Sequence, residues 1–119
     1  MAKTGTDLVN EAKQRITEIE PSEARAAHGA ADTVFVDVRE PNEYNLGRIP
    51  DAIPLPRGTI ETRGEGMLPR DKTIVVYCGG GSRSALVTES LQKMGYENVR
   101  SLAGGFRAWK EAGLPSAED

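Results

Sequence analysis

Two short runs of β-branched and apolar residues constrain the fold of this chain more than any other feature. TVFVDV (33–38) and KTIVVYC (72–78) are almost wholly apolar, which is typical of strands covered on both faces. Segments with helical periodicity separate these runs from each other and from shorter strand-like segments, and this alternation favours a parallel sheet. The sequence therefore predicts an α/β domain with a mainly parallel central sheet flanked by helices on both faces.

Local periodicity and capping residues place the remaining elements. Helices are expected at 4–15, 21–28, 40–47, from Ser82 or Arg83 to Gly95, and at 106–113, with shorter strands at 16–20, 52–56 and within ENVRSLAGG. In the first helix, Leu8, Val9 and Ala12 are expected on one side, with Ile16 as a further candidate for it. Residues 57–72, rich in glycine and charge, are expected to form the longest loop.

Size and charge exclude several classes of function. The chain has 119 residues, which is the size of one domain, and its net charge of −3 offers no basic surface for nucleic acid. No apolar run approaches the ~20 residues that span a bilayer, so no membrane interaction is expected. The N-terminus has no basic start followed by an apolar stretch, so we expect no secretory signal and a cytoplasmic protein.

The chain contains one cysteine, Cys78, and one histidine, His28. An intramolecular disulfide is therefore impossible, and no metal site is expected. His28 lies in SEARAAHGA, where His-Gly is typical of the end of a helix, so it is expected to be a solvated residue of the last turn. A nucleophilic Cys78 would need activation by groups other than imidazole.

The segment YCGGGSRS (77–84) joins a predicted strand to a predicted helix. Its glycines allow several N–H groups to point inward as an anion-binding nest, and the helix N-terminus and Arg83 add positive charge. A helix terminus contributes about 0.3–1 kcal/mol and a charge-assisted hydrogen bond about 1.5–3 kcal/mol. Lowering a thiol pKa by about two units requires about 2.7 kcal/mol, so the loop alone could form a thiolate. The other readings are a small buried cysteine and a flexible Gly-Ser turn.

Three blocks of the sequence resemble the single-domain rhodanese family of sulfurtransferases. They are VDVREPNEYNLGRIPDAIPLPRG, the loop YCGGGSRS, and LQKMGYENVRSLAGGFRAWKEAGLP. The resemblance divides the chain into a helical extension at 1–15 and a rhodanese-like domain at 16–119. Asp51 departs from the family pattern, which commonly has glycine there, and aspartate tolerates turn conformations.

The resemblance implies a mechanism without a cofactor, in which Cys78 attacks a small anionic sulfur donor such as thiosulfate and carries the sulfur as a persulfide. A thiol, cyanide or a protein cysteine would accept it. The residues implied to bind the substrate are Gly79, Gly80, Gly81, Ser82, Arg83 and Ser84. The Ser82 and Ser84 hydroxyls could bond to the sulfur or cap the helix.

Asp37, Arg39 and Glu43 are expected near the same edge of the sheet as supporting residues. Arg39 and Glu43 are four apart and could pair on the short helix, and an ion-pair network bracing the loop is favoured over contact with substrate. Three further arginines could line the approach to the loop or be solvated: Arg57, Arg63 and Arg70.

Two other functions remain open from the sequence. A cysteine-dependent phosphatase or arsenate reductase uses five residues between cysteine and arginine, whereas four separate Cys78 from Arg83 here. A persulfide carrier or redox sensor without turnover would use the same loop. No motif specifies the physiological donor, the acceptor or the oligomeric state.

Overall fold

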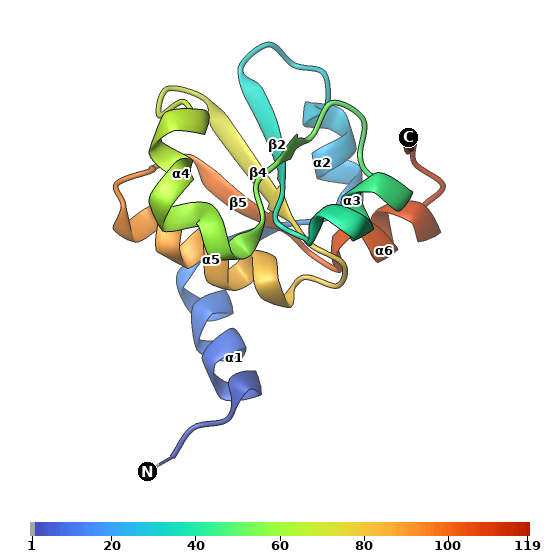
Figure 1. Cartoon of the computed structure of the whole chain (residues 1–119). Helices are drawn as coiled ribbons and strands as arrows, with labels where there is room; N and C mark the ends of the chain where they lie inside the picture. Colours follow the sequence, from blue (N-terminus) through green and yellow to red (C-terminus); the bar gives the residue numbers. More distant parts are fainter. Residues whose placement is uncertain (1) are drawn as a thin grey trace.

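A parallel sheet forms the centre of the molecule in the computed structural model, which describes residues 2–119 (Figure 1). Within this range the sheet has five strands in the order β1-β5-β4-β2-β3, and every pairing between them is parallel. The strands are β1 (Thr17–Ile19), β2 (Thr33–Asp37), β3 (Ile53–Pro54), β4 (Thr73–Tyr77) and β5 (Val99–Leu102). The predicted α/β fold is confirmed.

Helices cover both faces of this sheet (Figure 1). They are α1 (Gly5–Arg15), α2 (Pro21–Ala27), α3 (Pro41–Leu46), the 3-10 turn η1 (Arg57–Thr59), α4 (Ile60–Met67), α5 (Ser82–Lys93) and α6 (Gly105–Glu111). Val36 and Val76 pack with residues of α4 and α5 on one face. Phe35, Val75 and Tyr77 pack with residues of α2 and α6 on the other. Alternate residues of β2 and β4 thus enter two separate cores, which explains why these runs are apolar throughout.

The expectation of one long loop at 57–72 is wrong, because η1 and α4 occupy most of it. Gly64 and Gly66 lower the helical propensity of this segment, which is why the sequence indicates a loop. Ile60, Gly64 and Leu68 recur at helical spacing and are all buried. Burial of this face against the core outweighs the weak local preference.

The expectation of a solvated His28 is also wrong. Its ring is half-buried and packs edge-on against Phe35 and Trp109, with centroid distances of 5.2 and 5.9 Å. Nε2 of His28 lies 2.8 Å from the carbonyl oxygen of Pro50. The His28 ring at the end of α2 therefore packs against side chains of β2 and α6.

The predicted first helix is confirmed as α1, and it extends away from the sheet towards the N-terminus (Figure 1). Ala12 is buried and Val9 half-buried, but Leu8 is 50% exposed, so the predicted apolar side is only partly covered. Arg15 at its end pairs with Glu89 of α5 at 3.0 Å. None of the helices within residues 2–119 has the length and apolarity needed to cross a bilayer.

Asp51 has a φ of 66° and is the one non-glycine residue with positive φ in the described part of the chain. This left-handed conformation favours glycine, and aspartate is among the residues that tolerate it best. The structure thus agrees with the expected turn at this departure from the family pattern.

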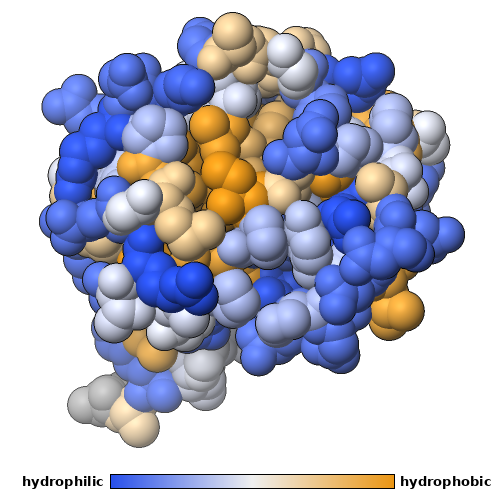
Figure 2. All heavy atoms as spheres, turned by 45° about the horizontal axis from the view of Figure 1, so that its top comes forward, coloured by the Kyte–Doolittle hydropathy of each residue, from blue (hydrophilic) through white to orange (hydrophobic). Residues whose placement is uncertain are grey.

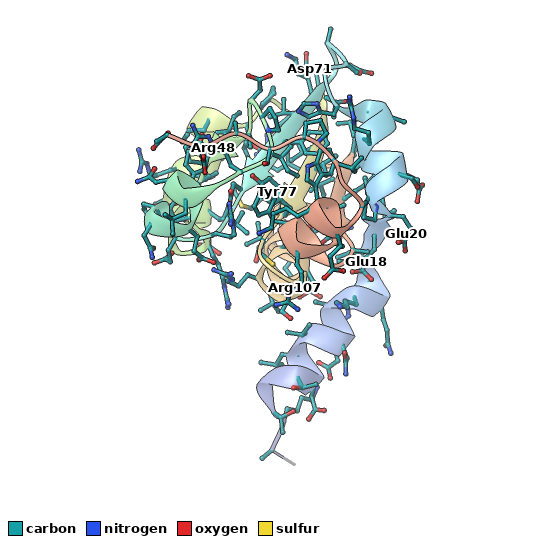
Figure 3. The ribbon with its side chains drawn as sticks, turned by 90° about the vertical axis from the view of Figure 1, so that its right-hand side faces the viewer. Glu18, Glu20, Arg48, Asp71, Tyr77 and Arg107 are labelled. Carbon is teal, nitrogen blue, oxygen red and sulfur yellow. The ribbon has the colours of Figure 1, made fainter. Side chains whose placement is uncertain are left out.

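The amino ends of β2 and β4 lie at the end of the sheet opposite the glycine-rich loop. Figure 3 shows Asp71, which precedes β4, at the top, and Tyr77, the last residue of β4, further down inside the molecule. When the top of Figure 1 is turned forward, apolar side chains occupy a hollow surrounded by hydrophilic residues (Figure 2). A cavity of about 250 Å³ beside β2 and β3 is lined in part by Val34, Phe35 and Ile53.

Candidate active site

Cys78 follows β4 directly and begins the loop that leads into α5. Gly81 ends this loop with a φ of 107° and is the N-cap of α5. A Cβ atom at this position would lie 3.3 Å from the backbone nitrogen of Gly104. Glycine therefore suits both the positive φ and the limited space beside Gly104. The loop therefore lies at the carboxyl edge of the sheet, where open α/β folds bind ligands.

The sulfur of Cys78 is the point on which the loop converges. The Gly81 N–H donates to Sγ at 3.0 Å and the Ser84 N–H at 3.4 Å, and Ser84 Oγ lies 3.5 Å from Sγ. Cys78 is only 1% exposed. Burial would raise the pKa of the Cys78 thiol, but the bonds from Ser84 and the N–H groups of Gly81 and Gly80 outweigh it and lower this pKa. The arrangement favours a thiolate.

The two serines of the loop differ in position. Ser84 contacts the sulfur and is buried, whereas Ser82 is exposed at the surface. The N-cap of α5 is Gly81 and carries no side-chain bond, so the capping role considered for the serines is wrong.

The start of α6 holds the outside of the loop. The Phe106 N–H donates to the Cys78 carbonyl at 2.8 Å, and the Arg107 N–H donates to the Gly79 carbonyl at 3.1 Å. Figure 3 shows Arg107 below Tyr77. Because these carbonyls point towards α6, the N–H groups of the loop can point towards the sulfur. A Cβ atom on Gly105 would lie 2.5 Å from the Cys78 carbonyl oxygen, which leaves room for glycine alone.

Gly105 and α6 were not among the predicted site residues. The Gly-Gly pair in SLAGGF follows a strand and precedes a helix, which is a pattern that indicates close backbone approach. The pattern does not specify which other segment of the chain lies against the two glycines.

Arg83 is directed towards Glu43 of α3. Its Nη1 and Nη2 atoms donate to the two carboxylate oxygens at 2.8 and 3.1 Å, and both side chains are about one-third exposed (34% each). The Arg83 guanidinium lowers the pKa of Glu43 to about 2. The negative charge of a Cys78 thiolate also raises the pKa of Arg83, but Glu43 contributes more to this increase. The fork of Arg83 thus braces the loop against α3.

Asp37 and Arg39 form a second pair, so the expected pairing of Arg39 with Glu43 is wrong. Arg39 Nη2 lies 2.7 Å from Asp37 Oδ2 and also donates to the Gly47 carbonyl at 2.6 Å. The Arg39 side chain is 7% exposed and the Asp37 side chain 0%. Arg39 precedes α3, which begins at Pro41, so the helical spacing of four residues does not apply.

Two cavities flank the loop, with volumes of about 440 and 490 Å³. Both are lined by Arg57, Arg83 and Leu86; the first extends towards α4 and the second towards α1. Of the three other arginines considered, Arg57 therefore lies nearest the candidate site. Arg63 lines neither cavity, and Arg70 instead bonds to the Met94 carbonyl at 2.8 Å.

Together, the parallel sheet and the cysteine at its carboxyl edge define a class of α/β proteins with a thiol held in a loop of N–H donors. The rhodanese-like domain model matches residues 20–112, which is most of the chain. The chain belongs to the rhodanese-like domain family, as its three sequence blocks predict.

Two relatives in this family are named for sulfur transfer. A sulfurtransferase of Allochromatium vinosum is 42% identical over 84 residues, covering 71% of this chain and 78% of its own. A thiosulfate sulfurtransferase of Actinobacillus succinogenes is 34% identical over 101 residues, covering 83% of this chain and 88% of its own.

The fold itself also has close solved counterparts. A rhodanese-related protein of Thermoplasma volcanium has a TM-score of 0.79 and 30% identity, covering 87% of this chain and 99% of that one. A protein of unknown function from Rhodopseudomonas palustris, described as a possible tyrosine phosphatase, has a TM-score of 0.87 and 36% identity. That comparison covers 97% of this chain and 95% of the other.

Proposed function

We propose that this sulfurtransferase-family protein transfers a sulfane sulfur from a small anionic donor such as thiosulfate through a persulfide on Cys78. The observation that carries the proposal is the convergence of the Gly81 and Ser84 N–H groups on Sγ, at 3.0 and 3.4 Å. The same donors can stabilise sulfur as a thiolate and, after transfer, the negative charge of a persulfide. No step of this chemistry calls for a metal or an organic cofactor.

In the first half-reaction the Cys78 thiolate attacks the outer sulfur of thiosulfate. A bond forms between Sγ and that sulfur, the bond between the two sulfur atoms of the donor breaks, and sulfite leaves with the electron pair. The enzyme then holds one extra sulfur atom on Cys78. The buried sulfur, at 1% exposure, is shielded from water that would compete for hydrogen bonds.

In the second half-reaction an acceptor attacks the terminal sulfur of the persulfide. With cyanide, a carbon–sulfur bond forms, the sulfur–sulfur bond breaks, and thiocyanate leaves. Cys78 keeps the electron pair of the broken bond and returns as a thiolate. Two separate half-reactions of this kind give ping-pong kinetics.

Arg57 is the side chain best placed to attract the anionic end of the donor. It lines both cavities beside the loop, whereas the guanidinium of Arg83 is occupied by Glu43. Arg57→Ala is expected to raise KM for thiosulfate several-fold with little change in kcat, since the charge acts mainly on binding. Arg63→Ala, on the exposed side of α4, is the matched control and should leave KM unchanged.

The proposal is tested by intact mass spectrometry. Incubation with thiosulfate should add the mass of one sulfur atom to the wild-type protein, and cyanide or dithiothreitol should remove it. Cys78→Ser should not gain this mass, because Cys78 is the one thiol of the chain. Sulfur retained by the serine variant would contradict the mechanism.

The structural similarity to the Rhodopseudomonas palustris protein makes phosphatase activity the alternative to test. A phosphatase needs an arginine free to bind phosphoryl oxygens. Here Nη1 and Nη2 of Arg83 both bond to Glu43. Aryl phosphate hydrolysis should therefore remain at background while thiosulfate:cyanide transfer is measurable. Steady-state turnover of cyanide to thiocyanate would also separate an enzyme from a persulfide carrier that reacts once.

A further inference from the structure

A second serine lies behind the sulfur contact. Ser101 is on β5 and is 0% exposed. Its register partner on β4 is Val76, two residues before Cys78. Register partners and alternate residues of a strand share one face of a sheet, so Ser101 lies on the same face as Cys78, beneath α5.

Ser101 is connected to the sulfur through one hydroxyl. Ser101 Oγ donates to Ser84 Oγ at 2.9 Å, and Ser84 Oγ lies 3.5 Å from Cys78 Sγ. A serine hydroxyl has one proton and two lone pairs. Because Ser101 supplies its own proton to Ser84, the Ser84 proton is not used between the two serines. It is therefore available to a thiolate, which can only accept.

We propose that Ser101 is a positioning residue that acts through Ser84 to stabilise the Cys78 thiolate. The consequence for the rate of persulfide formation rests on the proposed function, but the effect on the thiol itself does not. A hydrogen bond received by Ser84 also polarises its O–H group and strengthens the bond that this group donates.

Charged groups near Cys78 must stay unchanged for this effect to be isolated. Those on the elements around the loop are Arg83 of α5, Glu43 of α3, Asp37 and Arg39 at the end of β2, Arg57 of η1 and Arg107 of α6, and the titratable Tyr77 directly precedes Cys78. None of them is a hydrogen-bond partner of the Ser101 side chain within residues 2–119. A substitution at Ser101 therefore removes a hydroxyl without removing a charge.

The test is the ultraviolet absorbance of the thiolate as a function of pH, taken as the difference from the same protein carrying Cys78→Ser. The chain has one cysteine and three tyrosines, so this difference removes the absorbance of ionised tyrosine. Ser101→Ala is expected to raise the thiol pKa by about half to one pH unit, the scale of one hydrogen bond. Below both pKa values, persulfide formation should slow by about three- to tenfold, in proportion to the thiolate fraction. Above both pKa values, the variant and wild type should react equally fast. An unchanged thiol pKa overturns the proposal.

A pair of isosteric variants controls for packing around this buried position. Ser101→Thr keeps the hydroxyl and Ser101→Val replaces it with a methyl group, so the two have nearly the same shape. The threonine variant should have a thiol pKa closer to wild type than the valine variant. Equal pKa values in the two would overturn the proposal, and the comparison holds even if the alanine variant does not fold.

The route through Ser84 is tested by a double variant. In a Ser84→Ala background, Ser101→Ala should cause no further change in the thiol pKa, because the connecting hydroxyl is gone. The same shift in both backgrounds would overturn the role assigned to Ser84. Thr88→Val, on α5, is a matched control, because it removes another buried hydroxyl whose oxygen has no hydrogen-bond partner in the described residues. It should leave the thiol pKa unchanged.

These measurements separate the inference from the proposed function. If sulfur transfer is absent but the thiol pKa responds as described, the role of Ser101 stands and the proposed function fails. If sulfur transfer occurs and the thiol pKa does not respond, the role of Ser101 fails alone.

Discussion

The two carboxylate–arginine pairs near the loop that follows Cys78 differ in burial and in the segments that they join. Asp37 and Arg39 are two residues apart and almost completely buried, and Arg39 also lies 4.7 Å from the centre of the Phe106 ring. Glu43 and Arg83 are separated by 40 residues and are each about one-third exposed (34%).

This difference assigns the pairs different tasks. A buried ion has lost its hydration, so removing its partner leaves an uncompensated charge and destabilises the fold strongly. A pair that is one-third exposed keeps access to water and contributes little to stability, but a bidentate geometry fixes the direction of both side chains. Asp37–Arg39 is expected to hold the fold together, and Glu43–Arg83 is expected to hold the loop in place.

The largest effect is expected from Asp37→Asn. It leaves the Arg39 charge buried without its counter-ion, which typically costs about 3 kcal/mol of unfolding free energy. Urea denaturation of both proteins measures this change. Asp119→Asn is the matched control, because it removes the carboxylate of the exposed pair with Arg48 and should change the stability far less. Similar effects of the two substitutions would remove the distinction between buried and exposed pairs.

Substitutions of Arg83 test whether the loop needs a fork or only a charge. Arg83→Lys keeps the charge but cannot make two parallel bonds to Glu43, and Arg83→Ala loses both. We expect persulfide formation to slow by about tenfold in each variant, equivalent to about 1.4 kcal/mol of barrier. Single-turnover mass spectrometry measures the rates. A lysine variant within about twofold of wild type would show that a point charge is sufficient.

The smallest effect concerns Glu43 and pH. Its pKa in the folded protein is about 2, below the ordinary value of 4.5, so its contribution to stability is fully present above pH 4.5. The contribution is lost as the pH falls towards 2. Wild type should therefore exceed Glu43→Gln in unfolding free energy by less than about 1 kcal/mol at pH 7, and the difference should shrink below pH 4.5. Urea titrations at several pH values measure it; a difference that grows in acid contradicts the assignment.

Local patterns were sufficient to predict much of the fold and the location of the loop that contains Cys78. The β2 and β4 runs are long and apolar enough to identify the central strands, and the glycines after Cys78 mark the loop. The α4 helix was missed because Gly64 and Gly66 lower the helical propensity of the segment. The helix is stabilised by packing of its buried face against the core, which the local sequence does not indicate. Helical propensity is a weak guide where packing decides.

The partners of the site residues could not be predicted, because they depend on tertiary contacts. The partner of Glu43 lies 40 residues away, whereas spacing rules apply within one helix. Ser101 had a signal that was not used: in VRSL, alternation places it on the same face as the buried Val99. A polar residue on a buried face indicates a hydrogen-bond partner, but not which one.

The contact between the Gly104–Gly105 turn and the loop that follows Cys78 determines how far this loop can be treated as a transferable unit. Its carbonyls bond to the Phe106 and Arg107 N–H groups, and α6 is held in turn by Trp109, which is completely buried. YCGGGSRS grafted into another scaffold would lack these donors and would lose the orientation of its N–H groups. A transplant would need α6 with its two glycines, and amide hydrogen exchange at Phe106 and Arg107 would report whether the loop had closed.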